Sequence, residues 1–238
     1  MEGKKILVVG ASSGIGRATA VYLAKQGATV VLCARNEERL NEVAQEIGKK
    51  TYVYACDLKR EGSAENVFRF CEKNQLLLDG MVYSVGISLP ILIRSVSRAD
   101  MDNVMNTNYY SFVELAQCFY NKKYSSKGAA IVALSSIAAA NPIRGQSVYA
   151  SSKAALDTTV KVMAKEFIKR KIRVNSILPS YVSTPMIEGE VTYGTNNGVE
   201  NMPLGVIEPV QIAYLVEFLL SDKSKHITGE MIQVSSGT

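Results

Sequence analysis

The sequence predicts an α/β fold: a Rossmann-like, doubly wound parallel sheet of about seven strands with helices on both faces. Two observations lead to this prediction. Short apolar runs rich in β-branched residues recur along the chain, and stretches long enough for helices separate them. Such alternation is typical of a parallel sheet covered on both faces, with its ligand site beyond the carboxyl ends of the strands.

This alternation continues from one end of the chain to the other. The expected strands are residues 5–9, 29–33, 51–55, 80–83, 129–134, 173–177 and 230–234. The expected helices are residues 15–26, 37–47, 62–73, 99–122, 148–170 and 209–220. No linker or repeat divides them, so we expect a single domain over residues 1–238. Residues 183–207 are expected to form a long substrate loop, with a flexible surface insertion as the alternative.

Composition and charge exclude several classes of protein. Of the 238 residues, 47% are hydrophobic and 21% are charged, which is ordinary for a globular domain. No apolar run is long enough to span a membrane, and the first strand begins too early for a signal peptide, so we expect a cytoplasmic protein. The four cysteines form no C-x-x-C pair and there is one histidine, so no metal site is expected.

The basic residues do not predict nucleic-acid binding. The formal net charge is only +5, and no platform of interleaved aromatic and basic residues is present. The densest basic run is Lys169, Arg170, Lys171 and Arg173, at the end of an expected helix. Such a run is usually a solvated helix end, and a docking site for an acidic partner is the alternative.

The first expected strand runs directly into a glycine-rich turn and a helix. Gly10 suits a sharp turn, Gly14 lets the backbone approach a pyrophosphate, and Gly16 lets the helix pack closely on the strand. Amide groups at the start of the helix would hold the phosphates. A glycine turn can also be only a turn. The dinucleotide-binding residues predicted here are Gly10, Ser12, Ser13, Gly14, Ile15 and Gly16.

The end of the second expected strand favours NADP(H). A carboxylate at this place holds the ribose 2′-hydroxyl of NAD, but the strand ends in Cys33-Ala34-Arg35-Asn36 and has none. Arg35 can instead bind a 2′-phosphate. A surface pairing of Arg35 with Glu37 or Glu38 is the alternative.

Polar residues in three further places could carry chemistry. Tyr149 and Lys153 are four residues apart on one face of an expected helix, and a lysine ammonium favours the phenolate form of a tyrosine. Ser135 and Ser136 follow a buried strand at the edge where a site is expected to open. Asn108 lies inside a long expected helix, where it needs water or a backbone partner. Taken alone, the Tyr149 and Lys153 pair is better explained as an amphipathic helix that happens to carry both residues. Each of the other two stretches is equally well explained by solvent-facing polar residues.

Taken together, these residues resemble the short-chain dehydrogenase/reductase family, in its single-domain branch. The resemblance extends from Lys5 to Gly237. It rests on the glycine turn, Asp57, Asn108, Ser136, Tyr149, Lys153 and residues 179–184. It implies an NAD(P)-dependent oxidoreductase that acts on alcohol or carbonyl groups.

The resemblance also implies a role for each residue. Tyr149 would donate a proton to the substrate carbonyl, and Ser136 would hold the carbonyl oxygen. Lys153 would favour the tyrosinate and bind the nicotinamide ribose, and Asn108 would position a water molecule that links Lys153 to solvent. The other implied cofactor contacts are Asp57 and Leu58 at the adenine, Val182 and Thr184 at the carboxamide, the backbone at Gly86 and Pro179, and Tyr149 itself.

The sequence departs from the usual pattern of the family at three places. The usual Asn-Asn-Ala-Gly reads Tyr83-Ser84-Val85-Gly86, so the asparagine support is missing while Gly86 remains. The usual Pro-Gly reads Pro179-Ser180, which would cost backbone freedom, and the usual Val-Asp-Gly-Gly reads Val234-Ser235-Ser236-Gly237. None of these changes removes a residue of the implied catalytic set.

Within the family, the nearest resemblance is to 3-oxoacyl-(acyl-carrier-protein) reductases, through Asn106-Thr107-Asn108 and Ile227-Thr228-Gly229-Glu230. We therefore expect a small-molecule carbonyl or alcohol substrate, a 3-oxoacyl thioester that a carrier protein can hold. A sugar, steroid or polyketide carbonyl stays open, because the loop over residues 183–207 follows no readable rule. The alternative from another functional class is a protein that binds NADP(H) as a sensor and catalyses no reaction. The resemblance also suggests a homotetramer or homodimer built on the two longest helices.

Overall fold

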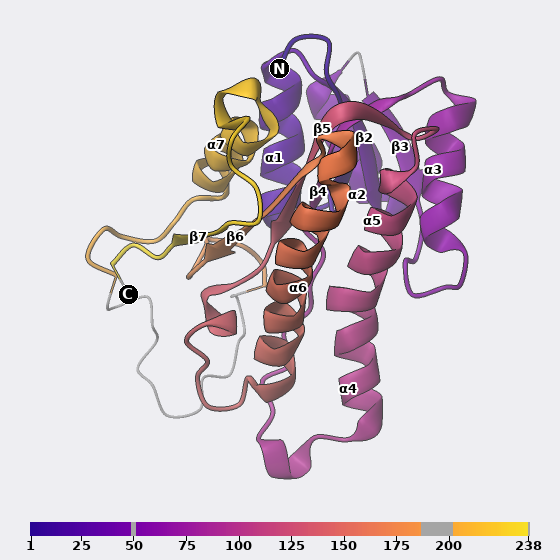
Figure 1. Cartoon of the computed structure of the whole chain (residues 1–238). Helices are drawn as coiled ribbons and strands as arrows, with labels where there is room; N and C mark the ends of the chain where they lie inside the picture. The colour runs from indigo at the N-terminus through magenta and orange to yellow at the C-terminus, as the bar shows by residue number, and fades with distance from the viewer. Residues whose placement is uncertain (49–50, 187–201, 238) are drawn as a thin grey trace.

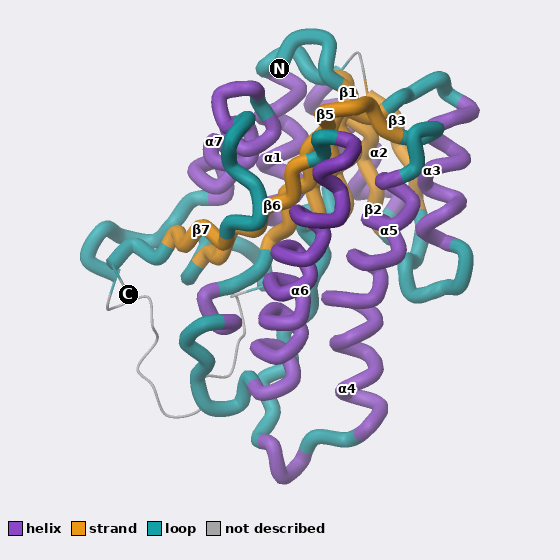
Figure 2. Tube along the Cα trace, in the orientation of Figure 1, coloured by secondary structure: helices purple, strands orange, loops and turns teal. Residues whose placement is uncertain are grey.

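The computed structural model describes residues 1–48, 51–186 and 202–237. Within these segments, seven strands form one parallel sheet in the order β3-β2-β1-β4-β5-β6-β7 (Figures 1 and 2). The strands are β1 (Lys5–Val9), β2 (Thr29–Ala34), β3 (Thr51–Ala55), β4 (Leu78–Tyr83), β5 (Ser125–Leu134), β6 (Arg173–Pro179) and β7 (Met231–Val234). The order reverses between β1 and β4, so the predicted doubly wound fold is confirmed.

Helices cover both faces of the sheet (Figure 1). The α-helices are α1 (Gly14–Lys25), α2 (Glu37–Ile47), α3 (Ser63–Lys73), α4 (Arg98–Met105), α5 (Ser111–Tyr120), α6 (Ser147–Glu166) and α7 (Pro209–Leu220). Short 3₁₀ turns occur at Ile93–Ser95, Ile137–Ala139, Phe167–Arg170 and Asp222–Ser224. Buried residues of α1, α2 and α7 join the apolar cluster on one face of the sheet, and those of α3, α5 and α6 join the cluster on the other.

The central strand β1 explains why the strands are apolar runs rather than alternating ones. Ile6 and Val8 belong to the cluster with α1 and α7, whereas Leu7 and Val9 belong to the cluster with α5 and α6. Successive side chains of a strand point to opposite faces, and helices bury both faces here. The four buried positions of β1, from Ile6 to Val9, are therefore all apolar, and only the partly exposed Lys5 at its start is charged.

The helix expected over residues 99–122 is divided in the structure. A π-helical turn over Asn106–Tyr110 separates α4 from α5. Two sets of polar contacts explain the interruption. The Tyr83 hydroxyl donates to the Thr107 carbonyl (2.6 Å), and the Asn108 side chain exchanges two hydrogen bonds with the backbone of Ile87. Because these contacts draw the turn toward the sheet, the backbone departs from regular α-helical geometry, as is frequent near functional sites.

The basic run after α6 is not a fully solvated helix end, and that interpretation was wrong for its two arginines. Arg170 donates to backbone carbonyls at the end of α5 and the start of β5. Arg173 is 7% exposed and donates to two carbonyls at the end of α7. Both arginines therefore join the ends of elements, and Lys169 and Lys171 are the exposed basic residues of the run.

The predicted substrate loop falls largely outside the described residues, since 187–201 are not among them. Its two ends are described: Val182 and Ile207 form a parallel β-bridge, and both are buried. In the parts of the chain that the structure describes, no helix combines the length and the apolar character needed to cross a bilayer.

Gly16 shows how closely α1 packs on the end of β1. A Cβ atom at this position would lie 2.1 Å from the Gly10 carbonyl oxygen and 2.5 Å from Ser84 Oγ. The first of these atoms belongs to the backbone, so an added methyl group would push the helix away from the strand.

We predict that Gly16→Ala lowers the free energy of unfolding by about 2–3 kcal/mol, measured by chemical denaturation. Gly80→Ala is the matched control, because its Cβ would meet the ends of two flexible side chains at 2.9 Å. We expect that control to lose about 1 kcal/mol or less. Equal losses would mean that the close approach at Gly16 is not a special constraint.

Candidate active site

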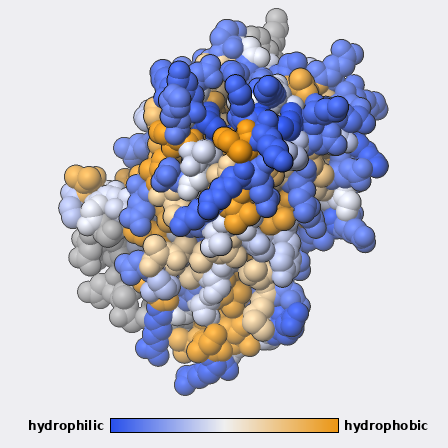
Figure 3. Space-filling model, viewed as in Figure 1, coloured by the Kyte–Doolittle hydropathy of each residue, from blue (hydrophilic) through white to orange (hydrophobic). Residues whose placement is uncertain are grey.

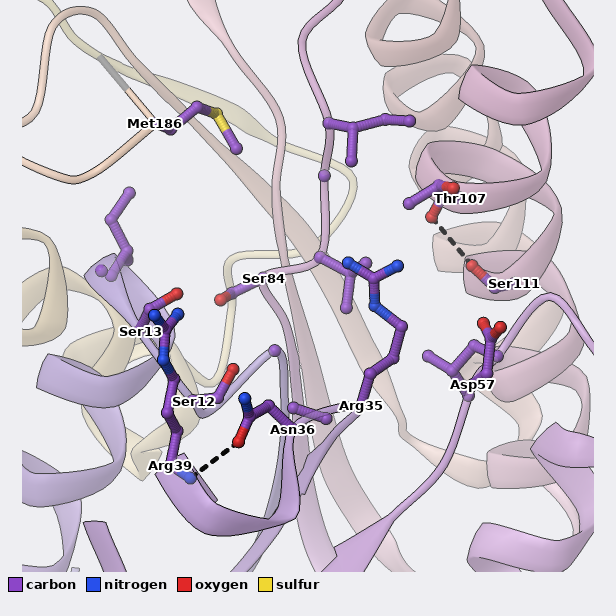
Figure 4. A pocket seen from close by; sticks show the side chains of 18 of the residues that line it. Ser12, Ser13, Arg35, Asn36, Arg39, Asp57, Ser84, Thr107, Ser111 and Met186 are labelled. Carbon is purple, nitrogen blue, oxygen red and sulfur yellow. Dashed lines mark hydrogen bonds between the residues drawn. The ribbon is translucent and has the colours of Figure 1, made fainter. Parts of the chain in front are cut away.

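A pocket of about 640 Å³ opens where the strand order reverses (Figure 4). Doubly wound sheets bind ligands at this place, because the loops that follow neighbouring strands diverge there. The predicted residues that line it are Gly10, Ser12, Ser13, Gly14, Ile15, Arg35, Asp57, Leu58, Gly86 and Thr184. The fold thus brings together segments that follow β1, β2, β3, β4 and β6.

The turn between β1 and α1 has the geometry of a phosphate site. Gly10 has a φ of +87°, and a Cβ there would lie 2.8 Å from the Ser84 carbonyl oxygen. A Cβ on Gly14 would lie 3.2 Å from Thr184 Cγ2, so the segment after β6 approaches the turn. Ser13 precedes α1 without a side-chain capping bond to its first amide groups. These amide groups therefore suit an anion bound at the start of α1.

Positive charge gathers on the α2 side of the pocket. Arg35 follows β2, Arg39 lies in the first turn of α2, and both side chains extend into the pocket in Figure 4. In the described part of the chain, Arg35 has no ion pair with Glu37 or Glu38. Arg39 was not predicted, nor was Asn36, whose Oδ1 accepts from the Arg39 amide (2.9 Å) and caps the helix. The only signal in the sequence was the four-residue spacing of the two arginines.

Five predicted cofactor residues do not line this pocket: Gly16, Tyr149, Lys153, Pro179 and Val182. Gly16 is buried against the Gly10 carbonyl. Pro179 ends β6, and Val182 is 3% exposed, so both side chains are buried in the protein. Tyr149 and Lys153 both lie on α6.

Lys153 is buried between α6, β5 and the segment after β4. It is 3% exposed, and its Nζ donates to the Leu134 carbonyl at the end of β5 (2.8 Å). A Cβ on Gly86 would lie 3.2 Å from Nζ, so the ammonium lies against a residue that lines the pocket. Burial lowers the pKa of Lys153 to about 8, and the charge of Asp157 opposes this effect. The ring centroid of Tyr149 lies 6.0 Å from Nζ.

Asn108 joins the π-helical turn to two neighbouring segments. Its Oδ1 accepts from the Ile87 amide (2.8 Å), and its Nδ2 donates to the Ile87 carbonyl (3.0 Å) and to Ser152 Oγ (2.9 Å). A Cβ on Gly86 would lie 3.7 Å from Asn108 Oδ1, which places this side chain close to Lys153. The fold therefore brings Asn108 and Lys153 to the same place although 45 residues separate them in the sequence.

The two serines after β5 have different surroundings. Ser136 is half-buried, and its Oγ accepts from the Ala138 amide (3.2 Å). Ser135 is 5% exposed and donates to Asp157 Oδ2 (2.9 Å), away from the edge of the sheet. Ser136 is therefore the hydroxyl that a substrate could reach. Among the residues described, no group of three or more His, Cys, Asp or Glu side chains could hold a metal ion.

The chain is similar over its full length to known oxidoreductases. A family model described as enoyl-(acyl carrier protein) reductase matches residues 10–238. The chain is 30% identical over 241 residues to the 3-oxoacyl-(acyl-carrier-protein) reductase FabG of Thermotoga maritima, covering 100% of this chain and 98% of that protein. A solved short-chain dehydrogenase/reductase from Brucella melitensis, named glucose/ribitol dehydrogenase, superposes with a TM-score of 0.93 at 26% identity and covers 100% of this chain and 97% of that one. The chain belongs to the short-chain dehydrogenase/reductase family.

A second solved member of this family has a similar structure and is named for the same activity as the Thermotoga relative. It is a 3-ketoacyl-(acyl-carrier-protein) reductase from Brucella melitensis in complex with NADH, with a TM-score of 0.90, 26% identity and coverage of 99% of this chain and 98% of that one. Short-chain dehydrogenases/reductases are oxidoreductases that use a nicotinamide cofactor and act on carbonyl or hydroxyl groups. This chain is an enzyme of that class.

The structure shows what replaces the residues that short-chain dehydrogenases/reductases usually have. Tyr83, in place of an asparagine, is fully buried; its hydroxyl holds the Thr107 carbonyl and lies 2.7 Å from Ser111 Oγ. Ser180 has no left-handed backbone, so the expected cost of losing a glycine there does not arise. Ser236 does have a positive φ of 54°, which costs about 1 kcal/mol for a residue with a side chain.

Proposed function

We propose that this protein is an NADPH-dependent carbonyl reductase whose substrate is a 3-oxoacyl thioester carried by an acyl carrier protein. The observation that carries the proposal is the position of Lys153, buried at the end of β5 between Tyr149 and a pocket that suits a dinucleotide. The Thermotoga relative and one of the two Brucella structures are named as reductases of such thioesters, which supports the choice of substrate.

The residues of the chain carry the proton transfer. A nicotinamide cofactor held in this pocket would supply the hydride for the carbonyl carbon. Tyr149 donates its hydroxyl proton to the carbonyl oxygen, and Ser136 donates a hydrogen bond to that oxygen as negative charge develops. The Lys153 ammonium stabilises the phenolate that remains on Tyr149. Asn108 fixes the π-helical turn and positions the water through which Lys153 regains a proton.

The adenosine end of the pocket favours NADP(H) over NAD(H). No carboxylate stands at the end of β2, and two arginines, Arg35 and Arg39, line the pocket there. A 2′-phosphate carries close to two negative charges, so it gains charge-assisted hydrogen bonds that a 2′-hydroxyl cannot make. Next to this charge, Asp57 and Leu58 contact the adenine.

The nicotinamide end is formed by segments from several strands. The backbone at Gly86 and Pro179 would border the nicotinamide ring, and Val182 with Thr184 would hold its carboxamide. Because the side chain of Val182 is buried, its contribution comes from the backbone.

A second cavity, of about 460 Å³, suits an acyl chain on an anionic carrier. Its lining residues are Leu92, Ile93, Arg94, Pro142, Ile143, Arg144, Gly145 and Ser147. Ser147 begins α6, two residues before Tyr149, so the cavity adjoins the start of the catalytic helix. Apolar side chains favour burial of an acyl chain, and the two arginines attract negative charge.

We also infer that the protein forms a homodimer or a homotetramer through the layer of α4, α5 and α6. Met101, Tyr110 and Val162 in this layer are 39%, 48% and 47% exposed. Figure 3 shows apolar patches among the polar surface on this face of the molecule. Large apolar side chains exposed on neighbouring helices are typical of a surface that binds another chain.

The first test is the oxidation of NADPH and of NADH with a short 3-oxoacyl thioester, followed by the nicotinamide absorbance. We expect turnover with NADPH to exceed that with NADH by about 10-fold or more, because one charge-assisted hydrogen bond to the 2′-phosphate contributes a free energy of that size. Ribitol and glucose with the oxidised cofactors are the comparison, since one structural relative is named for them. Preference for these sugars would show that the thioester is not the substrate. Tight NADPH binding without turnover of either would keep the cofactor and move the substrate search to steroid and polyketide carbonyls.

The role of Arg35 predicts a selective loss of affinity. Arg35→Ala should weaken NADPH binding about 10- to 100-fold and NADH binding less than about two-fold, because only NADPH has the 2′-phosphate. Fluorescence titration with each cofactor measures both. Arg69→Ala, an exposed arginine on α3, is the matched control and should change neither. Parallel weakening of both cofactors by Arg35→Ala would refute the 2′-phosphate contact.

The role of Tyr149 predicts a loss of chemistry without a loss of binding. Tyr149→Phe should lower kcat by about 1000-fold and leave the Kd of NADPH nearly unchanged, because only the proton donor is removed. Tyr214→Phe on α7, where the ring is 50% exposed, is the control. If Tyr149→Phe lowers kcat and cofactor binding together, Tyr149 is a structural residue.

A further inference from the structure

A buried carboxyl group lies one helical turn beyond Lys153 on α6. Asp157 is 5% exposed, and two serine hydroxyls, one in β6 and one just after β5, donate to it. Ser176 Oγ in β6 donates to Oδ1 (2.7 Å), and Ser135 Oγ after β5 donates to Oδ2 (2.9 Å). The proton transfer proposed above does not use this group. Burying a carboxyl group is costly, so these contacts must offset the loss of water.

The hydrogen bonds match the ionised form of Asp157. A serine hydroxyl has one proton, and each of the two serines donates its proton to a different carboxyl oxygen. The carboxyl group therefore needs no proton of its own to satisfy its partners. On balance the pKa of Asp157 is raised, because burial outweighs the two hydroxyl bonds and the charges of Lys153 and Lys161, which all lower it.

Ser135 connects this carboxylate to the catalytic groups. On one side of Ser135 is Leu134, whose carbonyl accepts from Lys153 Nζ (2.8 Å). On the other side is Ser136, the hydroxyl that a substrate could reach. A hydrogen bond that fixes Ser135 therefore also fixes the acceptor of the lysine and the position of the reactive serine.

We propose that Asp157 is a positioning residue of the active site: it holds the end of β5 against α6 and β6 through Ser135 and Ser176, and it places a carboxylate one helical turn from Lys153. This inference rests on the proposed roles of Ser136, Tyr149 and Lys153.

Among the described residues around Lys153, Asp157 is the acidic group whose charge affects the pKa of the lysine. It is the charge that raises the pKa of Lys153 against burial. The charges that act on Asp157 itself are Lys153 and Lys161, both on α6. The two strands face it with serine hydroxyls. The π-helical turn presents Tyr109, whose hydroxyl lies 3.1 Å from a threonine hydroxyl of α6, and the acids of α4 bond within their own helix and its cap.

Asp157→Asn tests the charge with little change of shape, because asparagine can hydrogen-bond both serines. Loss of the charge should lower the pKa of Lys153, from about 8, by about one unit. Lysine is charged below its pKa, so the alkaline limb of the kcat/KM profile should move to lower pH. Relative to the parent enzyme, kcat/KM should fall about five-fold at pH ~8 and change little at pH ~6.

Glu166→Gln is the matched control for the net charge. Glu166 is exposed on the same helix, and its loss changes the charge by the same amount. Its pH profile should coincide with that of the parent. Ser176→Ala is the second variant, for use if Asp157→Asn does not fold. It removes one donor and keeps the carboxyl group, so a smaller shift in the same direction is expected.

A second readout needs neither substrate nor cofactor. The phenolate absorbance of each protein, minus that of its Tyr149→Phe version, follows the ionisation of Tyr149 alone. In Asp157→Asn, Tyr149 should ionise at higher pH, because Lys153 loses its charge earlier. If the thioester is not reduced, the proposed substrate is wrong, and this titration still decides the role of Asp157. Unchanged titration of Tyr149 in the variant, with only a lower Tm, would overturn the proposal.

Discussion

Lys153 can keep a positive charge inside the protein only because fixed groups replace the water that burial removes. The hydrogen bond from Nζ to the Leu134 carbonyl is the first of these, and the negative charge of Asp157 is the second. Together they set much of the local architecture. The lysine joins α6 to the last residue of β5, and a Cβ on Gly86 would lie only 3.2 Å from the ammonium, so a side chain there would crowd it.

The parallel sheet places this lysine beside the cofactor pocket. Because all strands point the same way, the segments that follow β1, β4, β5 and β6 emerge at one edge. The reversal of strand order between β1 and β4 separates these segments and leaves room for the pocket. Close packing at Gly16 then brings the first amide groups of α1 to the same cavity. The pocket and the reactive side chains are therefore consequences of a single topology.

The departures from the usual family pattern are accommodated by local contacts. Tyr83 reaches from β4 to the π-helical turn and holds the Thr107 carbonyl, next to Asn108. Burial raises the pKa of the Tyr83 hydroxyl, so it stays a neutral hydrogen-bond donor. A larger residue thus fixes the turn in which Asn108 lies. Ser236, by contrast, is a glycine position filled at the cost of a left-handed backbone.

Much of the fold and part of the site could be predicted from the sequence, because buried elements have characteristic patterns of apolar residues along the chain. The buried positions of β1, from Ile6 to Val9, are all apolar, and this run predicted the strand with its observed ends. The edge strand β3 was also predicted with its observed ends, although its residues are only partly buried. Glycines that need a positive φ or a close approach mark the turn at Gly10. The four-residue spacing of Tyr149 and Lys153 places both on one face of α6.

Only the tertiary structure decided where polar side chains find their partners. The π-helical turn depends on Tyr83 and Ile87, which are distant in sequence from Asn108. Arg173 lies in a run of basic residues that is typical of a solvated surface, but its side chain is buried and donates to a carbonyl at the end of α7. The sequence does not mark Asp157 as a site residue, because its hydrogen-bond partners are serines in two other segments of the chain. The periodicity of apolar residues along the sequence shows which face of a helix or strand is buried. The groups that stabilise a buried charge come from other elements, so only the folded structure identifies them.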